Sequence, residues 1–288
     1  DRNRYEFGGS VKYDIMEGLS VTGRLRYERG DEKWILNEYA SSTAGRNLLG
    51  TMKDTRTFSE QTYADALASY NKTWDETYSL SVTAGGSFTK TSASSIELIG
   101  WGDKEFKVNN GVITPGAYYP NIFSPKNYYT MQTTETLKEK RLNSVFATAQ
   151  FGYKEGLFLD VSARNDWSST LPKDNDSYFY PSVGVSWIFT QMLNKMGHNT
   201  GILSFGKIRA SWAQVGNDTD AYMLRDYYKI DYDIKGGIFS ANNEDWMANP
   251  NLKNETINSW ELGLELKAFD NRVGVDVAYY KKNAKDQI

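Results

Sequence analysis

The sequence predicts an all-β fold: a transmembrane antiparallel up-and-down β-barrel, to which this chain contributes about ten strands of a larger barrel. Apolar and polar residues alternate with a period of two along these segments, the pattern of strands with one apolar and one polar face. The segments run to roughly 11 to 14 residues, longer than the about five or six residues usual in soluble sheets. Short and long connections alternate, as expected for short periplasmic turns and long extracellular loops.

The length of these segments suits a membrane. A strand that rises about 3.3 Å per residue and tilts by about 45° climbs about 2.3 Å per residue, so about 11 residues cross an apolar band of about 25 Å. The mean hydropathy is -0.60, and no apolar run reaches the about 20 residues that a transmembrane helix needs. Because a barrel presents only every second residue to lipid, this low value is compatible with a membrane protein.

Two hairpins are expected in the first half of the chain. The first joins residues 4–15 to 19–28, with apolar faces made by Tyr5, Phe7, Val11, Tyr13, Leu19, Val21, Leu25 and Tyr27. The second joins residues 62–74 to 78–90 through a turn at Asp75-Glu76, with apolar faces made by Ala64, Ala66, Ala68, Tyr70, Leu80, Val82, Ala84 and Phe88. The alternation fails in residues 30–60 and 91–138, which are expected to be long loops.

Three more hairpins follow. Residues 141–153 and 157–167 meet at the turn 154–156, with apolar faces made by Val145, Ala147, Ala149, Phe151, Leu157, Leu159, Val161 and Ala163. After a polar link, residues 178–189 and 202–214 flank a connection long enough for one helical turn, with apolar faces made by Val183, Val185, Trp187, Ile208, Ala210 and Trp212. A third long loop, 216–254, precedes the hairpin 260–282, with apolar faces made by Trp260, Leu262, Leu264, Leu266, Val273, Val275, Val277 and Tyr279.

Charge placement separates a barrel from soluble alternatives. In most of these strands the apolar face lacks Asp, Glu, Lys and Arg through its middle, while the other face carries them freely. One Lys or Arg at the lipid midplane would cost about 2–4 kcal/mol. A soluble sandwich has shorter strands and more even turns, and a propeller would repeat every roughly 40–50 residues, a period that this sequence lacks.

Five ordered blocks resemble the SusC/RagA family of TonB-dependent outer-membrane transporters of Bacteroidetes. They are LNSVFATAQFGYKEGLFLDVSARNDWSS from Leu142, YFYPSVGVSWIFTQ from Tyr178, KIRASWAQVGN from Lys207, NPNLKNETINSWELGLEL from Asn249 and FDNRVGVDVAYYKKNAKDQI from Phe269. The first half of the chain is similar only in style. The resemblance implies a barrel of about 22 strands, a plug inside it and a location in the bacterial outer membrane.

The resemblance also implies a function and partners. It implies energised import of a nutrient, an oligosaccharide or a peptide, with a SusD-like surface lipoprotein and TonB, and it leaves open a dimer of transporter–lipoprotein pairs. Residues 1–288 are expected to be part of one barrel domain, with the plug, the TonB-contacting segment and the signal peptide absent from this chain. The alternatives are a siderophore- or cobalamin-type TonB receptor, a passive porin and a surface adhesin-like β protein.

Composition leaves little room for catalysis, metals or nucleic acid. The chain has no Cys and one His, His198, in a connection expected at the periplasmic rim. The formal net charge is -3, and Lys and Arg are spread through the strands rather than clustered. The paired acids of the long loops offer too few oxygens for a calcium site. We therefore expect no enzymatic activity, no cofactor, no metal and no nucleic-acid partner.

Two sets of residues are candidates for a role in transport. Aromatic residues of the long loops are expected to contact the ligand or the lipoprotein lid, with loop self-packing as the alternative: Trp101, Tyr118, Tyr119, Tyr128, Tyr129, Tyr222, Tyr227, Tyr228, Tyr232 and Trp246. Charged residues on the polar strand faces are expected to line the lumen: Arg24, Arg26, Asp160, Arg164, Lys207, Arg209, Glu261, Glu265, Lys267 and Asp276. Aromatic residues near the outward strand ends, such as Trp212 and Trp260, are expected at the membrane interfaces.

Overall fold

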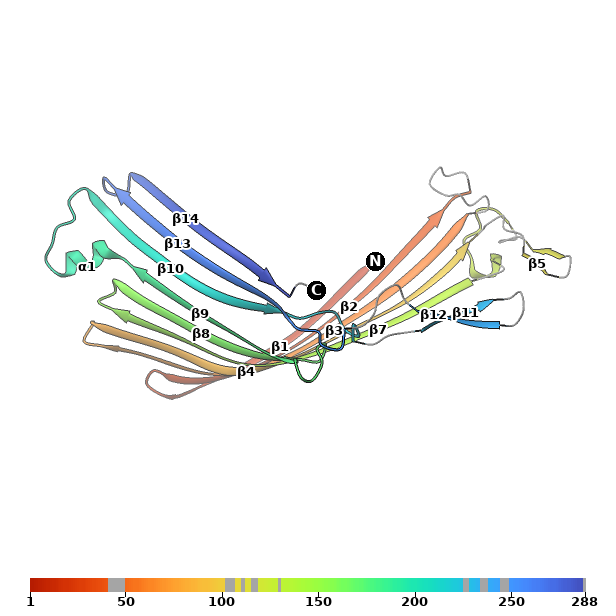
Figure 1. The fold of residues 1–288 in the computed structure, drawn as a ribbon, viewed down its shortest axis with the longest axis horizontal. Coiled ribbons are helices and arrows are strands. Elements are labelled where there is room, and N and C mark those ends of the chain that lie inside the picture. The colour runs from red at the N-terminus through yellow and green to blue at the C-terminus, as the bar shows by residue number, and fades with distance from the viewer. Residues whose placement is uncertain are drawn as a thin grey trace. The chain divides into compact units, whose positions relative to one another are not determined.

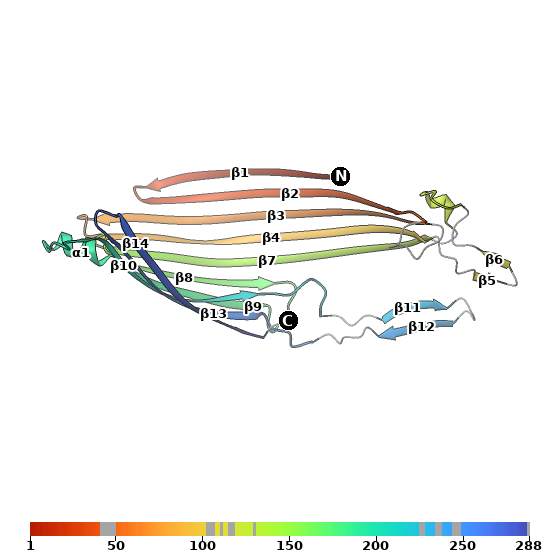
Figure 2. The ribbon, with the colours of Figure 1, turned by 90° about the horizontal axis from the view of Figure 1, so that it is seen from above.

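A computed structural model describes residues 1–40, 50–101, 107–109, 112–114, 119–128, 131–224, 228–233, 238–243 and 249–286. Ten strands form one antiparallel sheet in the order β1-β2-β3-β4-β7-β8-β9-β10-β13-β14, so strands adjacent in the sequence lie side by side (Figure 1, Figure 2). Their bounds are β1 Arg2–Met16, β2 Leu19–Glu38, β3 Thr51–Trp74, β4 Tyr78–Trp101, β7 Met131–Tyr153, β8 Leu157–Ser168, β9 Ser177–Trp187, β10 Leu203–Asn217, β13 Glu255–Ala268 and β14 Val273–Lys285. The predicted ten strands in up-and-down order are confirmed.

Smaller elements occupy the connections. The strands β5 Lys107–Asn109 and β6 Val112–Thr114 pair with each other, as do β11 Tyr228–Asp233 and β12 Ile238–Asn243. A 3₁₀ turn, η1, covers Pro125–Asn127, and one short helix, α1, covers Phe189–Lys195. Among the described residues, no helix has both the length and the apolarity to cross a membrane.

The prediction that residues 30–60 and 91–138 form long loops was largely wrong. β2 continues to Glu38 and β3 begins at Thr51, while β4 continues to Trp101 and β7 begins at Met131. Ion pairs link neighbouring strands in these extensions: Lys53–Glu97 at 2.6 Å, Lys90–Glu139 at 3.0 Å and Arg29–Glu60 at 3.3 Å. Both faces of these strand ends carry polar residues. The alternation of apolar and polar residues that marks the strand segments near the short turns is therefore absent there.

The hairpin turns explain how strands of this length reverse within two residues. At Asp75-Glu76, Lys154-Glu155 and Asp270-Asn271 both residues have positive φ, between 46° and 65°. Each pair is closed by a hydrogen bond between the flanking residues, such as Gly156 N to Tyr153 O at 3.0 Å. Two successive left-handed residues are the type I′ geometry, whose twist matches that of the flanking strands. The predicted short turns are confirmed.

The helix α1 fills the connection between β9 and β10, where one helical turn was expected. Thr190 is 2% exposed, and its hydroxyl accepts a hydrogen bond from Gly206 N at 3.0 Å. The ring of Phe189 lies over Gly206, where a Cβ would come within 2.1 Å of the ring. Lys195 bonds Glu155 at 2.7 Å in the β7–β8 turn. The helix thus joins two hairpins at the short-turn end of the sheet.

The chain divides into two compact units. Unit 1 comprises residues 1–8, 26–62 and 90–139, and its small core holds Met52 and Tyr128 packed against Phe123 and Met131. The amide of Asn127 fastens the segment before β7, since it donates to Tyr119 O at 2.7 Å and to Ile122 O at 2.8 Å. Part of the predicted loop is therefore an ordered turn held by its own side chains.

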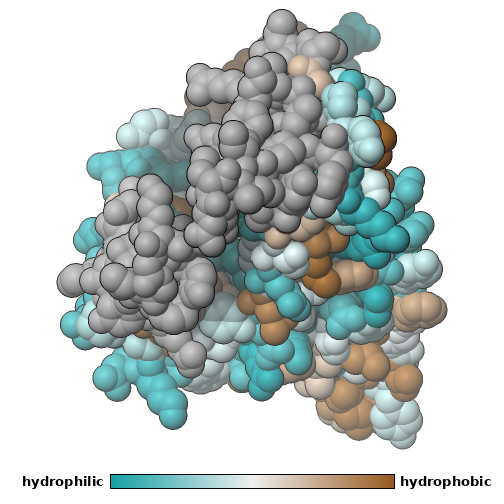
Figure 3. Space-filling model, turned by 90° about the vertical axis from the view of Figure 1, so that its right-hand side faces the viewer, coloured by the Kyte–Doolittle hydropathy of each residue, from teal (hydrophilic) through white to brown (hydrophobic). Residues whose placement is uncertain are grey.

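Unit 2 comprises residues 9–25, 63–89 and 140–288. Register sets apolar side chains of successive strands in rows, such as Leu159 opposite Val185 and Leu264 opposite Val277. Many of these side chains are exposed; Val275 is 54% and Val277 is 60% exposed. Seen from the right-hand side of Figure 1, the surface of the chain also shows hydrophobic residues (brown) beside hydrophilic ones (teal) (Figure 3). Water would penalise such a surface, whereas lipid would not.

Candidate functional site

The polar face of the sheet carries charges that pair across strands. Arg209 on β10 bonds Glu261 on β13 at 3.1 Å and Asp276 on β14 at 3.3 Å. Gly263 makes this reach possible, because the guanidinium lies across the position that its Cβ would occupy. On β13, Glu265 and Lys267 pair at 3.0 Å. Five of the predicted lumen charges on the last three strands thus form one three-residue network and one separate ion pair, and each contains both signs.

Two buried aspartates repeat one arrangement elsewhere on this face. Asp65 on β3, whose side chain is 0% exposed, accepts two hydrogen bonds from Arg24 Nε and one from its Nη2, at 2.8–3.1 Å, and one from the Tyr63 hydroxyl at 2.5 Å. Asp166 on β8 is likewise bonded by an Arg and a Tyr. A buried carboxylate would be costly alone, and here each has a guanidinium and a phenol as partners.

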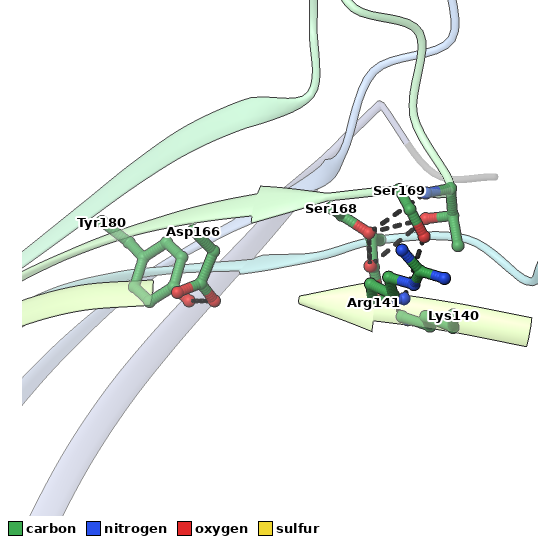
Figure 4. Close-up of polar contacts among 8 residues, drawn as sticks. Lys140, Arg141, Asp166, Ser168, Ser169 and Tyr180 are labelled. Atoms are coloured by element: carbon green, nitrogen blue, oxygen red, sulfur yellow. Dashed lines mark hydrogen bonds and ion pairs between the residues drawn. The ribbon is translucent and has the colours of Figure 1, made fainter. Parts of the chain in front are cut away.

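The hydrogen-bond network around Asp166 links three strands. Arg164 Nε donates to Asp166 at 2.8 Å and its Nη2 donates to Ser144 on β7 at 2.9 Å. The hydroxyl of Tyr180 on β9 also donates to Asp166, and Figure 4 shows the two side chains pointing at each other. Tyr178, the register partner of Asp166, stacks on Tyr180 with ring centroids 5.7 Å apart. These contacts lock β7, β8 and β9 together on one face.

A second polar cluster lies where β8 ends, at the long-loop end of unit 2. Asp218 follows β10 and is bonded by Lys140 Nζ and by the hydroxyls of Ser168 and Thr170. Its side chain is 7% exposed, and Ser168 and Thr170 are also buried. Ser169 and Arg141 exchange two more hydrogen bonds at 2.9 and 3.0 Å, and Figure 4 shows Lys140, Arg141, Ser168 and Ser169 together. The cluster ties the β8–β9 link to the start of the 218–254 connection.

The lumen candidates all lie on strands of the sheet. Besides the networks above, Arg26 lies 3.9 Å from Glu6 in unit 1, Asp160 accepts a hydrogen bond from Gln150 at 2.7 Å, and Lys207 is the register partner of Glu265. The candidates carry both signs and are mostly paired, so this face offers fixed dipoles and ion pairs rather than one dominant charge. That these residues line a lumen stays a prediction.

The loop aromatic candidates separate into four groups. Tyr118, Tyr129, Tyr227 and Trp246 lie outside the described residues, and of Trp101, Tyr228 and Tyr232 the structure describes only the backbone, in β4 and β11. Tyr128 is 6% exposed and packs on Met52 and Gly100, which fits the self-packing alternative. Burial raises its pKa. Tyr119 and Tyr222 are 64% and 41% exposed and remain free to contact a ligand or a partner.

Several contacts were missed by reading the sequence. Asp65, Asp166, Tyr63 and Tyr180 were not among the candidates, although their parity along the strands matches the polar face. Asp218 is one of the paired loop acids considered for a calcium site, and its side chain is buried against Lys140. No cluster of three or more metal-ligating side chains occurs among the described residues, and His198 is exposed after α1.

Relatives of known class match the chain. All of it, residues 1–288, matches the family described as TonB dependent receptor-like, beta-barrel. TonB-dependent receptor P3 of Formosa agariphila is 25% identical over 283 residues, which are 95% of this chain and 26% of that receptor. TonB-dependent receptor P26 of the same organism is 28% identical over 231 residues, 75% of this chain and 21% of that receptor. This chain thus spans about a quarter of the length of these curated relatives.

Solved structures share the fold. A chain of the RagAB peptide transporter matches with a TM-score of 0.71 and 18% identity, over 98% of this chain and 30% of that one. The ferric-catecholate import receptor Fiu from K12 E. coli matches with a TM-score of 0.56 and 11% identity, over 98% of this chain and 41% of that one. The expected barrel fold and outer-membrane location are confirmed. With its family match running along its whole length, the chain belongs to the TonB-dependent receptors and forms part of the β-barrel of one of them.

Proposed function

We propose that this barrel portion serves a SusC-like importer that takes up a peptide or an oligosaccharide together with a SusD-like surface lipoprotein. The observation that carries the proposal is the likeness to the chain of the RagAB peptide transporter, with a TM-score of 0.71 against 0.56 for the siderophore-type receptor Fiu. The five sequence blocks between Leu142 and Ile288 support the same subgroup. TonB-dependent receptors are transporters rather than enzymes, so no covalent chemistry is assigned to the chain.

Two parts of the structure suit such a role: a rigid polar strand face and exposed aromatic residues in the loops. Ion pairs of Arg209, Asp65 and Asp166 cross-link the polar face of unit 2. The barrel wall would therefore keep its shape while the plug or the ligand moves past it. The exposed rings of Tyr119 and Tyr222 supply flat contact area to a sugar ring, a peptide or a lipoprotein lid. TonB would act through a segment outside this chain, and uptake would proceed by closure of the lid over the ligand and movement of a plug.

The test expresses the full-length receptor together with any SusD-like lipoprotein that is encoded beside it. We expect the two to co-purify from detergent extracts of outer membranes, and the pair to bind either defined peptides or defined oligosaccharides by calorimetry. Uptake of the bound class should stop when the proton-motive force is collapsed. Uptake that continues without that force would indicate a passive porin, and ferric-siderophore binding by the receptor without any lipoprotein would indicate a siderophore-type receptor.

A matched pair of variants addresses the loop aromatics. Tyr222→Ala and Tyr119→Ala remove exposed rings, and each is expected to weaken ligand or lipoprotein binding about tenfold, equal to about 1.4 kcal/mol. The control is Tyr5→Ala, which removes a ring that is 48% exposed on the edge strand β1. Equal weakening by all three variants would remove the support for loop contacts.

A further inference from the structure

The apolar face of unit 2 is not smooth: it contains a groove across β9, β10, β13 and β14. The groove has a volume of about 470 Å³, within the range of about 300–1,000 Å³ typical of small-ligand sites. Its floor is one register row, Val185, Ala210, Leu262 and Tyr279. The next row brings in the indoles of Trp212 and Trp260, whose centroids lie 6.1 Å apart. Small Ala210 between larger neighbours makes the hollow.

The groove contains no charge of its own. Glu261 also borders it, but its carboxylate bonds Arg209 on the opposite face of the sheet. Ser211 also borders the groove and has the parity of the polar face, whereas the other side chains are aliphatic or aromatic and belong to the apolar face of the strands. The surroundings of the groove are therefore hydrocarbon along its length.

One end of the groove lies where the apolar band stops. On β14 the outward positions run Val273, Val275, Val277 and Tyr279, and then change to Lys281, Asn283 and Lys285. Lys281 is the register partner of Trp260, so it stands at the level of the two indoles. Tryptophan marks the boundary between hydrocarbon and headgroups. By strand direction this end belongs to the long-loop side, the outer leaflet.

The sign of the charge at that end is uniform. Beyond the indoles, the outward positions on the other strands are Pro181, Phe179 and Ser177 on β9, Gln214 and Gly216 on β10, and Asn258 and Thr256 on β13. Between the indoles and the long loops, the described outward positions of these four strands thus hold two lysines, Lys281 and Lys285, and no carboxylate. Such a rim attracts an anion, as polybasic segments attract anionic headgroups.

We propose that this groove binds one acyl chain of an anionic, phosphate-bearing lipid of the outer leaflet, whose phosphate is held by Lys281. A hydrocarbon chain fits an apolar channel that ends at a cation, whereas a protein partner would bury a much wider patch, of at least about 1,200 Å² in total. The site is independent of the nutrient carried and of the lipoprotein partner. The bound lipid would occupy a fixed position against β9, β10, β13 and β14.

The test measures lipid retention by the full-length receptor. The receptor is reconstituted in nanodiscs of equal parts dioleoylphosphatidylglycerol and dioleoylphosphatidylcholine, extracted into mild detergent and analysed by native mass spectrometry. We expect one phosphatidylglycerol per receptor to be retained, in at least fivefold preference over phosphatidylcholine. Ala210→Leu, which fills the hollow, and Lys281→Gln, which removes the cation, should each reduce retention at least fivefold, and Lys281→Arg should restore it.

The matched control is Ala68→Leu, the same change at an exposed alanine on β3. It should leave retention unchanged, and heat-modified gel mobility should show that every variant is folded. Equal retention of both lipids would overturn the proposal, as would retention that is unaffected by Ala210→Leu. Loss of receptor dimers in Ala210→Leu with lipid retention unchanged would also overturn it, in favour of a protein contact on this face.

Discussion

The guanidinium of Arg209 lies flat across Gly263 on the neighbouring strand. A Cβ at Gly263 would be 2.5 Å from Nε and 2.6 Å from Cζ of that arginine. The absent side chain lets Arg209 cross β13 and bond Asp276 on the strand beyond, at 3.3 Å. One glycine therefore decides whether charges on three strands form a single network.

Gly263→Ala should break that network while preserving the fold. The methyl group meets a flexible side chain, so Arg209 moves and its bonds to Glu261 and Asp276 are lost. Both carboxylates are about half exposed, so solvent screens these ion pairs and we expect only a small fall in the free energy of unfolding. In a double-mutant cycle, the coupling between Arg209→Gln and Glu261→Gln should vanish in the Gly263→Ala background. Gly274→Ala is the control, since its Cβ would sit at an ordinary 3.7 Å from Lys267 Cγ; an equal effect there would contradict the prediction.

Asp65→Asn should be far more costly. The change takes the charge from a fully buried group and leaves the Arg24 guanidinium with a neutral partner. We expect a loss of about 3 kcal/mol in the free energy of unfolding, measured by denaturant titration of the receptor in detergent. Asp160→Asn, at an exposed position that bonds Gln150, should cost less than about 1 kcal/mol. Similar losses for the two variants would mean that burial does not set the cost.

Asp218→Asn should loosen the long-loop end of unit 2. Lys140 donates to one oxygen of this carboxylate, and Ser168 and Thr170 donate to the other; in asparagine one of these oxygens is replaced by an NH2 donor, so the amide cannot accept from all three. Because Lys140 is partly exposed, we expect a cost of about 1–3 kcal/mol. Hydrogen exchange in residues 168–176 should speed up, whereas exchange near α1 should not. Asp174→Asn, an exposed acid of the same link, is the control, and faster exchange in both variants would count against the cluster.

Acid should release α1 from the β7–β8 turn. The hydrogen bond from Lys195 lowers the pKa of Glu155, with a smaller contribution from Gln191. A carboxyl whose pKa is lowered in the folded state stabilises that state above its unfolded pKa, and this contribution disappears as pH falls through the folded pKa. Exchange protection of residues 189–195 should therefore decrease as pH falls from neutral through the range in which Glu155 is protonated. Glu155→Gln should flatten this pH dependence; a profile unchanged by that substitution would refute the assignment.

Prediction from the sequence failed where the two faces of a strand have similar, polar surroundings. The ends of β2, β3, β4 and β7 lie outside the apolar band, so both faces are polar and periodicity carries no signal. Asp65 and Asp166 have the parity of the polar face, yet their burial depends on Arg24, Arg164 and Tyr180, which reach them from other strands or from two residues away. No pattern along one strand contains that information.

The sequence by itself determined the number of strands in the main sheet, their up-and-down order, the position of the tight turns and which side of each strand is apolar. These follow from local physics: a period of two, the length needed to cross an apolar band, and the exclusion of charge from hydrocarbon. Only the tertiary structure decided which polar groups meet, such as Arg209 over Gly263 and Lys140 on Asp218. Register between strands fixes those meetings, and register is a property of pairs of strands rather than of any single one.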